Sequence, residues 1–173
     1  MGTSIKHIET PEEWKSWLDY GSHRPLLYLC LTNIKPFSTV IEFGSGFGST
    51  PLVRDYCQLN NLQFYSFDTD NEWCDKVGSE FVHNFANIEL KEVGLLFIDG
   101  KPGEQRKDLV DQHRETASII IVHDTEPGSE YVYGMTDVLK SFKYRIDFTC
   151  EKGPHTTALS NKVNIEKWIS HQD

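Results

Sequence analysis

Three glycines, Gly44, Gly46 and Gly48, alternate with other residues directly after the short β-rich run Thr39–Phe43. Because glycine has no Cβ, a backbone built this way turns tightly and lets a ligand approach closely. The helix expected over Pro51–Leu59 begins just downstream and would offer free backbone N–H groups to that ligand. A strand, a glycine turn and a helix in this order are typical of α/β folds that bind nucleotides.

Two acidic residues indicate which nucleotide-like ligand is bound. The spacing is GxGxG, whereas a dinucleotide fingerprint would place its third glycine at Ser49, and Glu42 lies two residues before the first glycine. A carboxylate there suits S-adenosylmethionine, which carries an ammonium and a sulfonium and no pyrophosphate. Asp68 follows Gly48 by 20 residues, where an acid accepts hydrogen bonds from ribose hydroxyls. Asp70 is the less favoured substitute.

A second group of polar residues follows two apolar strands further along the chain. Asp99 comes directly after one of them, and His123 and Asp124 come directly after the other. Because parallel strands end at the same edge of a sheet as the glycine turn, we expect these side chains to converge there. Two carboxylates and an imidazole are a plausible ligand set for Mg²⁺ or another divalent ion. The imidazole of His123 also titrates near neutrality, which suits a general base.

The stretches ViEfGsGfGsT and YSFDtD resemble the first and second motifs of class I S-adenosylmethionine-dependent methyltransferases, and the similarity runs over residues 37–160. This resemblance implies that the cofactor is S-adenosylmethionine, with Asp68 on its ribose. Thr69 and Trp73 are the candidates for contacts with the adenine, and Asp99 is assigned to both the cofactor and the acceptor. The remaining cofactor contacts implied are Glu42, Gly44, Ser45, Gly46 and Gly48.

The downstream pattern fIDG…HDT resembles a subgroup that includes macrocin- and cephalosporin-type O-methyltransferases. In such enzymes a metal holds the acceptor hydroxyls and lowers their pKa, which implies metal ligands at Asp99, Asp124 and His123. The subgroup commonly has a histidine three residues after the first acid, but Pro102 occupies that position here. His123 is therefore the replacement base, with Lys101 and Asp99 as alternatives; of the remaining histidines only His155 is kept in reserve.

The elements that must position these residues alternate between strands and helices. This order predicts a Rossmann-like, doubly wound α/β fold with a mostly parallel sheet of the seven-stranded type. Only 25 residues separate Asp68 from Gly94, so we expect the third strand, at Asn87–Val93, and the fourth helix to be abbreviated. The expected strands are Thr39–Phe43, Leu62–Phe67, Gly94–Ile98 and Ser118–Val122, followed by an antiparallel hairpin of Lys143–Cys150 and Thr156–Ser160.

Helices are expected between and before these strands. Thr10 and Pro11 begin a helix with Trp14, Trp17 and Leu18 on one face, and a second covering helix runs from Pro25 to about Thr32. Trp73, Val77 and Phe81 predict a helix by their spacing of four. Further helices are expected over Pro51–Leu59, Glu104–Thr116 and Glu130–Phe142. The chain of 173 residues is interpreted as one domain, with covering helices in 1–36, a core in 37–160 and a C-terminal segment in 161–173.

The composition of the chain argues against some classes of binding partner. The formal charge is −9, and no run of Lys or Arg forms a basic stripe, which argues against nucleic acid and against an anionic membrane surface. The four cysteines are far apart, and the longest apolar stretch, Leu26–Leu31, is too short to span a bilayer. We therefore expect a soluble cytoplasmic protein, for which a homodimer is one possible assembly.

These observations favour an O-methyltransferase that acts on a sugar, a glycan or another hydroxylated small molecule. A catalytically silent domain that binds the cofactor and serves as a partner or regulator is the alternative, because Pro102 replaces the usual base. An NAD-dependent oxidoreductase is a third reading, which the GxGxG spacing and Glu42 weaken.

Overall fold

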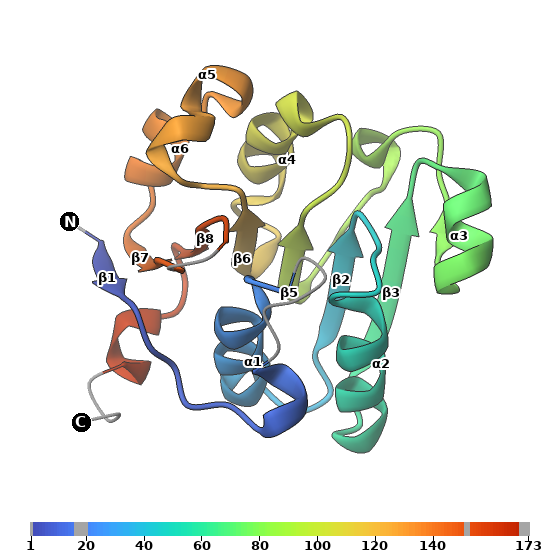
Figure 1. Ribbon diagram of the computed structural model, residues 1–173, viewed down its shortest axis with the longest axis horizontal. Coiled ribbons are helices and arrows are strands. Elements are labelled where there is room, and N and C mark those ends of the chain that lie inside the picture. Colours follow the sequence, from blue (N-terminus) through green and yellow to red (C-terminus); the bar gives the residue numbers. More distant parts are fainter. Residues whose placement is uncertain (1, 16–20, 151–152, 170–173) are drawn as a thin grey trace.

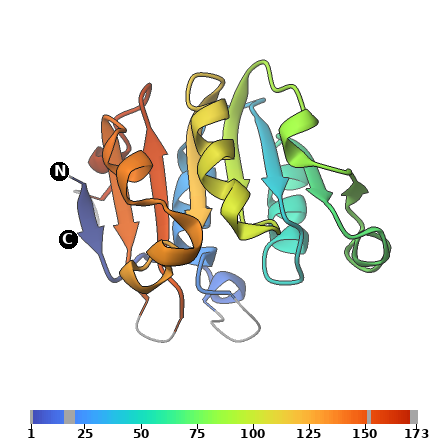
Figure 2. The ribbon, with the colours of Figure 1, turned by 90° about the horizontal axis from the view of Figure 1, so that it is seen from above.

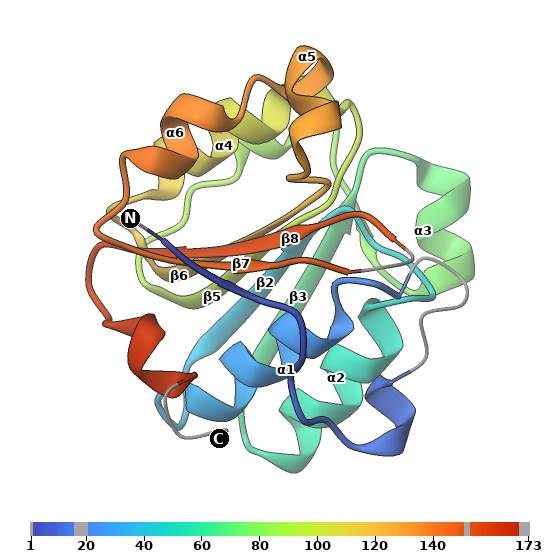
Figure 3. The ribbon, with the colours of Figure 1, turned by 60° about the vertical axis from the view of Figure 1, so that its left-hand side comes forward.

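The computed structural model describes residues 2–15, 21–150 and 153–169. Its strands form one eight-stranded sheet in the order β1-β7-β8-β6-β5-β2-β3-β4. Helices α1 and α2 cover one face of this sheet, and α4, α5 and α6 lie over the other (Figures 1 and 3). No helix among the described residues is long and apolar enough to cross a membrane.

The central strands are parallel to one another, and the C-terminal hairpin is antiparallel (Figure 2). Strand β8 runs antiparallel to both of its neighbours, β6 and β7. The predicted fold class, a Rossmann-like α/β fold with a mostly parallel sheet and an antiparallel hairpin, is therefore confirmed. The strands are β1 (Thr3–Ile5), β2 (Thr39–Phe43), β3 (Gln63–Asp68), β4 (Glu80–Phe81), β5 (Val93–Ile98), β6 (Ala117–His123), β7 (Tyr144–Phe148) and β8 (Thr156–Ser160).

The helices agree with the expected segments, with shifts at several ends. The α-helices are α1 (Arg24–Asn33), α2 (Thr50–Leu59), α3 (Asn71–Val77), α4 (Arg106–His113), α5 (Glu130–Tyr133) and α6 (Thr136–Lys140). Short 3₁₀ turns complete the chain: η1 (Glu12–Trp14), η2 (Phe85–Asn87), η3 (Gly103–Gln105), η4 (Pro127–Ser129) and η5 (Ile165–Trp168).

Three expectations about these elements were wrong. The segment before residue 37 includes an edge strand, β1, which pairs in parallel with β7, and the described residues that follow Pro11 form the 3₁₀ turn η1 and not an α-helix. Trp17 and Leu18 lie outside the described residues. The third strand is β4, not Asn87–Val93, because Gly78 ends α3 in the left-handed conformation with φ of 78° and Phe81 then pairs with β3. The helix expected over Glu130–Phe142 is divided into α5 and α6 at Gly134, whose φ is 59°.

The middle of the sheet is the most buried part of the fold. Leu95–Ile98 of β5 and Ile119–Val122 of β6 are buried on both faces, as expected for parallel strands covered by helices. One apolar cluster lies between these strands and α1, and a second lies between them and α4. The residues that follow β5 and β6 are therefore held on a rigid support.

Candidate active site

The glycine turn crosses directly over the end of β5. Gly44 has a φ of 94°, and a Cβ at this position would lie 2.2 Å from the backbone nitrogen of Gly100. The backbone N–H of Asp99 donates a hydrogen bond of 2.8 Å to the carbonyl of Phe43. The first sequence motif and the first downstream acid are thus joined through backbone contacts that leave no room for a side chain.

Glu42 holds the glycine turn to its surroundings. Its carboxylate accepts hydrogen bonds from three hydroxyl groups, those of Ser49, of Thr50 at 2.7 Å and of Ser66 at 2.6 Å. Burial raises the pKa of Glu42 to about 7, although these hydroxyl hydrogen bonds lower it. Glu42 has only 1% of its surface exposed, and its three hydrogen bonds hold β2, β3 and the start of α2 together.

Asp68 lies beside the glycine turn, as the sequence predicted for the ribose-binding acid. One of its carboxylate oxygens accepts hydrogen bonds from the backbone N–H of Ser45 at 2.9 Å and from the Ser45 hydroxyl at 3.3 Å. The indole N–H of Trp73 donates to the Ser45 carbonyl at 2.7 Å. Asp70 caps α3 by accepting from the backbone N–H of Trp73, so its carboxylate has a structural role. The hydroxyl of Thr69 donates to the carbonyl of Lys101 at 3.1 Å.

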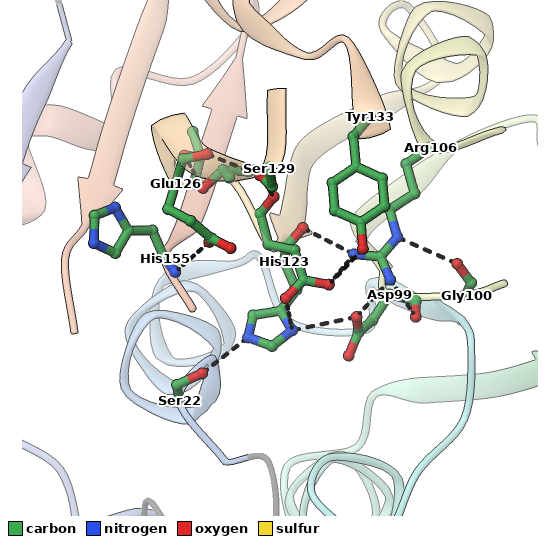
Figure 4. A network of polar contacts seen from close by, with 12 residues as sticks. Ser22, Asp99, Gly100, Arg106, His123, Glu126, Ser129, Tyr133 and His155 are labelled. Carbon is green, nitrogen blue, oxygen red and sulfur yellow. Dashed lines mark hydrogen bonds and ion pairs between the residues drawn. The ribbon is translucent and has the colours of Figure 1, made fainter. Parts of the chain in front are cut away.

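Arg106, at the start of α4, lies against Asp99 (Figure 4) and also contacts Asp124, so it connects the two downstream acids. Its guanidinium lies 2.8 Å from the Asp124 carboxylate and 3.1 Å from the Asp99 carboxylate. It also donates to the backbone carbonyls of Asp99, Gly100 and His123 at 3.0 to 3.2 Å. Because the Arg106 side chain is only 5% exposed, these contacts form a buried charge network at the ends of β5 and β6.

His123 lies between an acid and a hydroxyl group. Its Nδ1 is 3.2 Å from an Asp99 carboxylate oxygen and 3.5 Å from an Asp124 oxygen, and its Nε2 is 2.9 Å from the Ser22 hydroxyl (Figure 4). Burial lowers the pKa of His123, but the charge and hydrogen bond of Asp99, together with Asp124, outweigh burial and raise the pKa above its ordinary value. Burial raises the pKa of Asp99, but the adjoining His123 and Arg106 lower it overall. This arrangement directs Nε2 toward a hydroxyl oxygen, as a general base requires.

A second imidazole, that of His23, lies against His123. The ring centroids are 5.0 Å apart, and the two ring planes are nearly perpendicular. His23 is buried, and neither of its ring nitrogens has a hydrogen-bond partner among the described residues. Burial, followed by the charge of His123, lowers the pKa of His23 to about 3, so this ring is neutral.

The predicted metal ligands Asp99, Asp124 and His123 lie together, but Arg106 alters what they can bind. Its guanidinium already contacts both carboxylates. A hard divalent ion would have to take oxygens that the guanidinium holds, and its charge would lie beside that of Arg106. This ligand set therefore does not fit Mg²⁺ as it is arranged.

Sequence reasoning located part of this site. Asp99, His123 and Asp124 converge as expected, whereas Lys101 is exposed and forms no ion pair with a described acid. His155 contributes only its backbone N–H, which donates to Glu126 at 3.0 Å. The residues that sequence reasoning missed are Arg106, His23, Ser22 and Tyr133, whose ring lies 4.9 Å from the Arg106 guanidinium carbon.

Comparison with known proteins supports the fold. No family model and no curated protein matches the sequence. Among solved structures, a methyltransferase from Pyrococcus furiosus has a TM-score of 0.55 at 14% identity over 90% of this chain and 89% of that chain. An O-methyltransferase from Bacillus cereus, in complex with S-adenosylhomocysteine, has a TM-score of 0.54 at 11% identity over 87% of this chain and 84% of that one.

A putative tRNA methyltransferase from Streptococcus pneumoniae, in complex with S-adenosyl-L-methionine, also matches, with a TM-score of 0.53 at 10% identity over 80% of this chain and 73% of that one. At these identities the likeness is one of fold. The chain therefore has the fold of the S-adenosylmethionine-dependent methyltransferases of class I, and none of these three structures is described as macrocin-type.

Proposed function

We propose that this protein is an S-adenosylmethionine-dependent methyltransferase that methylates a hydroxyl group of a sugar, a glycan or another small molecule. The observation that carries the proposal is the junction of the glycine turn with the Asp99–His123 pair at the carboxyl end of the parallel sheet. The fold is shared with methyltransferases whose structures hold the cofactor or its product. Ligands of such sheets bind at this edge.

The residues present fit the cofactor. A Cβ added at Gly46 would meet nothing nearer than 3.9 Å, so the turn leaves open space on that side. Asp68 is half-buried beside the turn and is the proposed ribose ligand. Gly44, Ser45, Gly46 and Gly48 form the proposed cradle, and Glu42 positions it from beneath. When bound, S-adenosylmethionine supplies an activated methyl group, whose transfer turns the sulfonium into the neutral thioether of S-adenosylhomocysteine.

The residues beyond β5 and β6 then serve the acceptor. His123 accepts the proton of the acceptor hydroxyl at Nε2 as the oxygen forms its bond to the methyl carbon. Asp99 holds the ring by its hydrogen bond to Nδ1 and favours the imidazolium that forms. Arg106 fixes Asp99 and Asp124 in place. The Ser22 hydroxyl lies 2.9 Å from Nε2, so an acceptor hydroxyl has to displace Ser22 to contact the base.

Two binding measurements test the cofactor assignment. Calorimetric titration with S-adenosylhomocysteine should show one site, and titration with NAD should show none. The reverse result would favour the oxidoreductase reading, and no binding of either would remove the proposal.

Incubation with labelled S-adenosylmethionine and a panel of glycans, phenols and tRNA, in EDTA or in Mg²⁺, identifies the acceptor. We expect turnover of a hydroxyl compound that EDTA does not abolish and that His123→Asn reduces by about 10²–10⁴-fold, the usual contribution of a general base. Turnover that needs Mg²⁺ would restore the metal prediction.

A catalytically silent cofactor-binding domain is the second candidate. Arg106 already contacts both Asp99 and Asp124, and Pro102 stands where the O-methyltransferases of the resembled subgroup carry a base. Binding of S-adenosylhomocysteine without turnover of any acceptor class in the panel would favour this candidate.

A further inference from the structure

The buried histidine at the start of α1 lacks the contacts that its ring needs. His23 is 2% exposed, and neither of its nitrogens makes a well-formed hydrogen bond among the described residues, although the backbone of Gly48 lies near enough to offset slightly the lowering of its pKa by burial. Leaving a buried polar group unpaired costs about 1–3 kcal/mol, so such a group calls for a ligand, a water molecule or an ion. The ring is held between Phe97 and His123, each with its centroid 5.0 Å away.

Two further donors lie within reach of this imidazole. One ligand atom from each of His23, Asp99 and His123 can be chosen so that all three lie within 4.8 Å of one another. Arg106 and His123 both contact the Oδ1 atom of the Asp99 carboxylate. Its Oδ2 has no hydrogen bond among the described residues and is available to a ligand.

We propose that His23, Asp99 and His123 bind a transition-metal ion of the zinc class. Two imidazoles and one carboxylate suit Zn²⁺, Co²⁺ or Fe²⁺, whereas Mg²⁺ prefers oxygen ligands alone. At metal–ligand distances of about 2.1 Å, donors in a tetrahedral site lie about 3.4 Å apart, so the side chains close in by roughly 1 Å.

This site differs from the one predicted from the sequence. Asp124 is not a ligand and stays paired with Arg106 at 2.8 Å. One ring nitrogen of His123 gives up its hydrogen bond, to Asp99 or to Ser22, and binds the ion instead. The hydrogen bond at the other ring nitrogen remains and orients the ring, as is usual for metal-binding histidines. The proposal needs neither cofactor nor acceptor, so it does not rest on the proposed function. Because an imidazole that binds a metal through one ring nitrogen carries its proton on the other, zinc-bound His123 cannot act as the base, so zinc should inhibit turnover and EDTA should restore it.

Calorimetry with zinc on the full chain, free of any affinity tag, tests the site. We expect wild type to bind one zinc ion per chain. His23→Leu should bind zinc at least about a hundredfold more weakly, since even the loss of a residue that only hydrogen-bonds a metal ligand costs about 10–100-fold in affinity. His83→Gln removes an exposed imidazole at the sheet edge and should leave zinc affinity unchanged. The visible absorption of bound Co²⁺ should report nitrogen ligands in wild type and not in His23→Leu.

His23→Leu replaces an unpartnered polar ring with an apolar side chain, so this variant should fold at least as well as wild type. Its melting temperature and its binding of S-adenosylhomocysteine, measured in parallel, verify that it is folded. Absence of zinc binding to wild type, or equal zinc affinity of wild type and His23→Leu, would overturn the site. Failure to bind S-adenosylhomocysteine with zinc binding intact would overturn only the proposed methyltransferase.

Discussion

Arg106 lies between two carboxylates that follow different strands, Asp99 after β5 and Asp124 after β6. A guanidinium with its planar array of donors can bind both at once, which a lysine ammonium cannot do with the same geometry. The guanidinium therefore contacts the two carboxylates that the sequence pattern assigned to a metal ion. It also makes the pair of acids compatible with folding before any ligand binds.

Removal of this arginine should destabilise the protein strongly. Arg106→Leu leaves two largely buried carboxylates without their cation, and we expect the free energy of unfolding to fall by about 3 kcal/mol. Arg106→Lys should recover part of the loss. Urea unfolding monitored by circular dichroism gives the values. Lys15→Ala is the control, because the ion pair of Lys15 with Glu12 is 56% and 89% exposed and should contribute little. An Arg106→Leu variant as stable as wild type would refute the assigned role.

Glu42 should make stability depend on pH. Burial raises its pKa from an ordinary 4.5 to about 7, so the folded state holds this proton more tightly than the unfolded state. The stabilisation is complete below pH 4.5 and is lost as pH rises to about 7, a change of about 3 kcal/mol at 1.36 kcal/mol per pKa unit. Urea unfolding across this range should show wild type losing about 3 kcal/mol relative to Glu42→Gln, because the histidines titrate in both proteins. Parallel pH profiles for the two proteins would contradict the prediction.

The sequence could predict some residues of the site and not others, for a physical reason. Asp99, His123 and Asp124 each follow an apolar strand, and parallel strands bring their ends together wherever the helices lie. Arg106 and His23 reach the site through helix starts. Arg106 looks like an ordinary cation in a polar helix, and its partner Asp124 is 18 residues away. Only the packing of α1 and α4 on the sheet brings these side chains in.

At the scale of elements, the sequence predicted the strands that form a continuous apolar core and missed the short ones. β2 and β8 have the expected bounds because their patterns and flanking turns are local. β1 and β4 have three and two residues, and they exist because a neighbouring strand edge pairs with them. The same tertiary pairing moved Phe81 from a helix into a strand.

Two glycines of the turn beside β5 allow the effects of a substitution on folding and on ligand binding to be measured separately. Gly44→Ala would place a Cβ 2.2 Å from Gly100 at a φ of 94°, so we expect a large loss of stability or an unfolded protein. Gly46→Ala meets nothing nearer than 3.9 Å and should fold normally. If the turn holds the cofactor, the folded Gly46→Ala variant should nevertheless bind S-adenosylhomocysteine at least about tenfold more weakly than wild type, a loss of about 1.4 kcal/mol in binding free energy. Thermal melting and calorimetry measure the two effects.

Gly128→Ala serves as the control for both variants, because a Cβ at Gly128 meets nothing within 4 Å. It should change neither melting temperature nor affinity. A Gly46→Ala variant with wild-type affinity would show that the turn does not approach the ligand.

At the scale of the whole molecule, charge distinguishes the acceptor classes that the fold allows. One structural neighbour is described as a putative tRNA methyltransferase and another as an O-methyltransferase. This chain carries a formal charge of −9, and tRNA is a polyanion whose binding depends on cations that release its counterions. The buried Arg106 cannot supply that attraction, because its charge is used by Asp99 and Asp124.

We therefore expect no tRNA binding tighter than about 10⁻⁴ M at physiological salt, the weak limit of non-specific binding. Fluorescence anisotropy with labelled tRNA measures it, and S-adenosylhomocysteine binding by the same sample shows that the protein is competent. Lowering the salt should not produce tight binding, since repulsion by a net negative protein becomes stronger as screening decreases. Binding tighter than about 10⁻⁶ M that weakens steeply with added salt would instead assign the acceptor to nucleic acid. The hydroxyl acceptor would then be replaced by a base of the RNA.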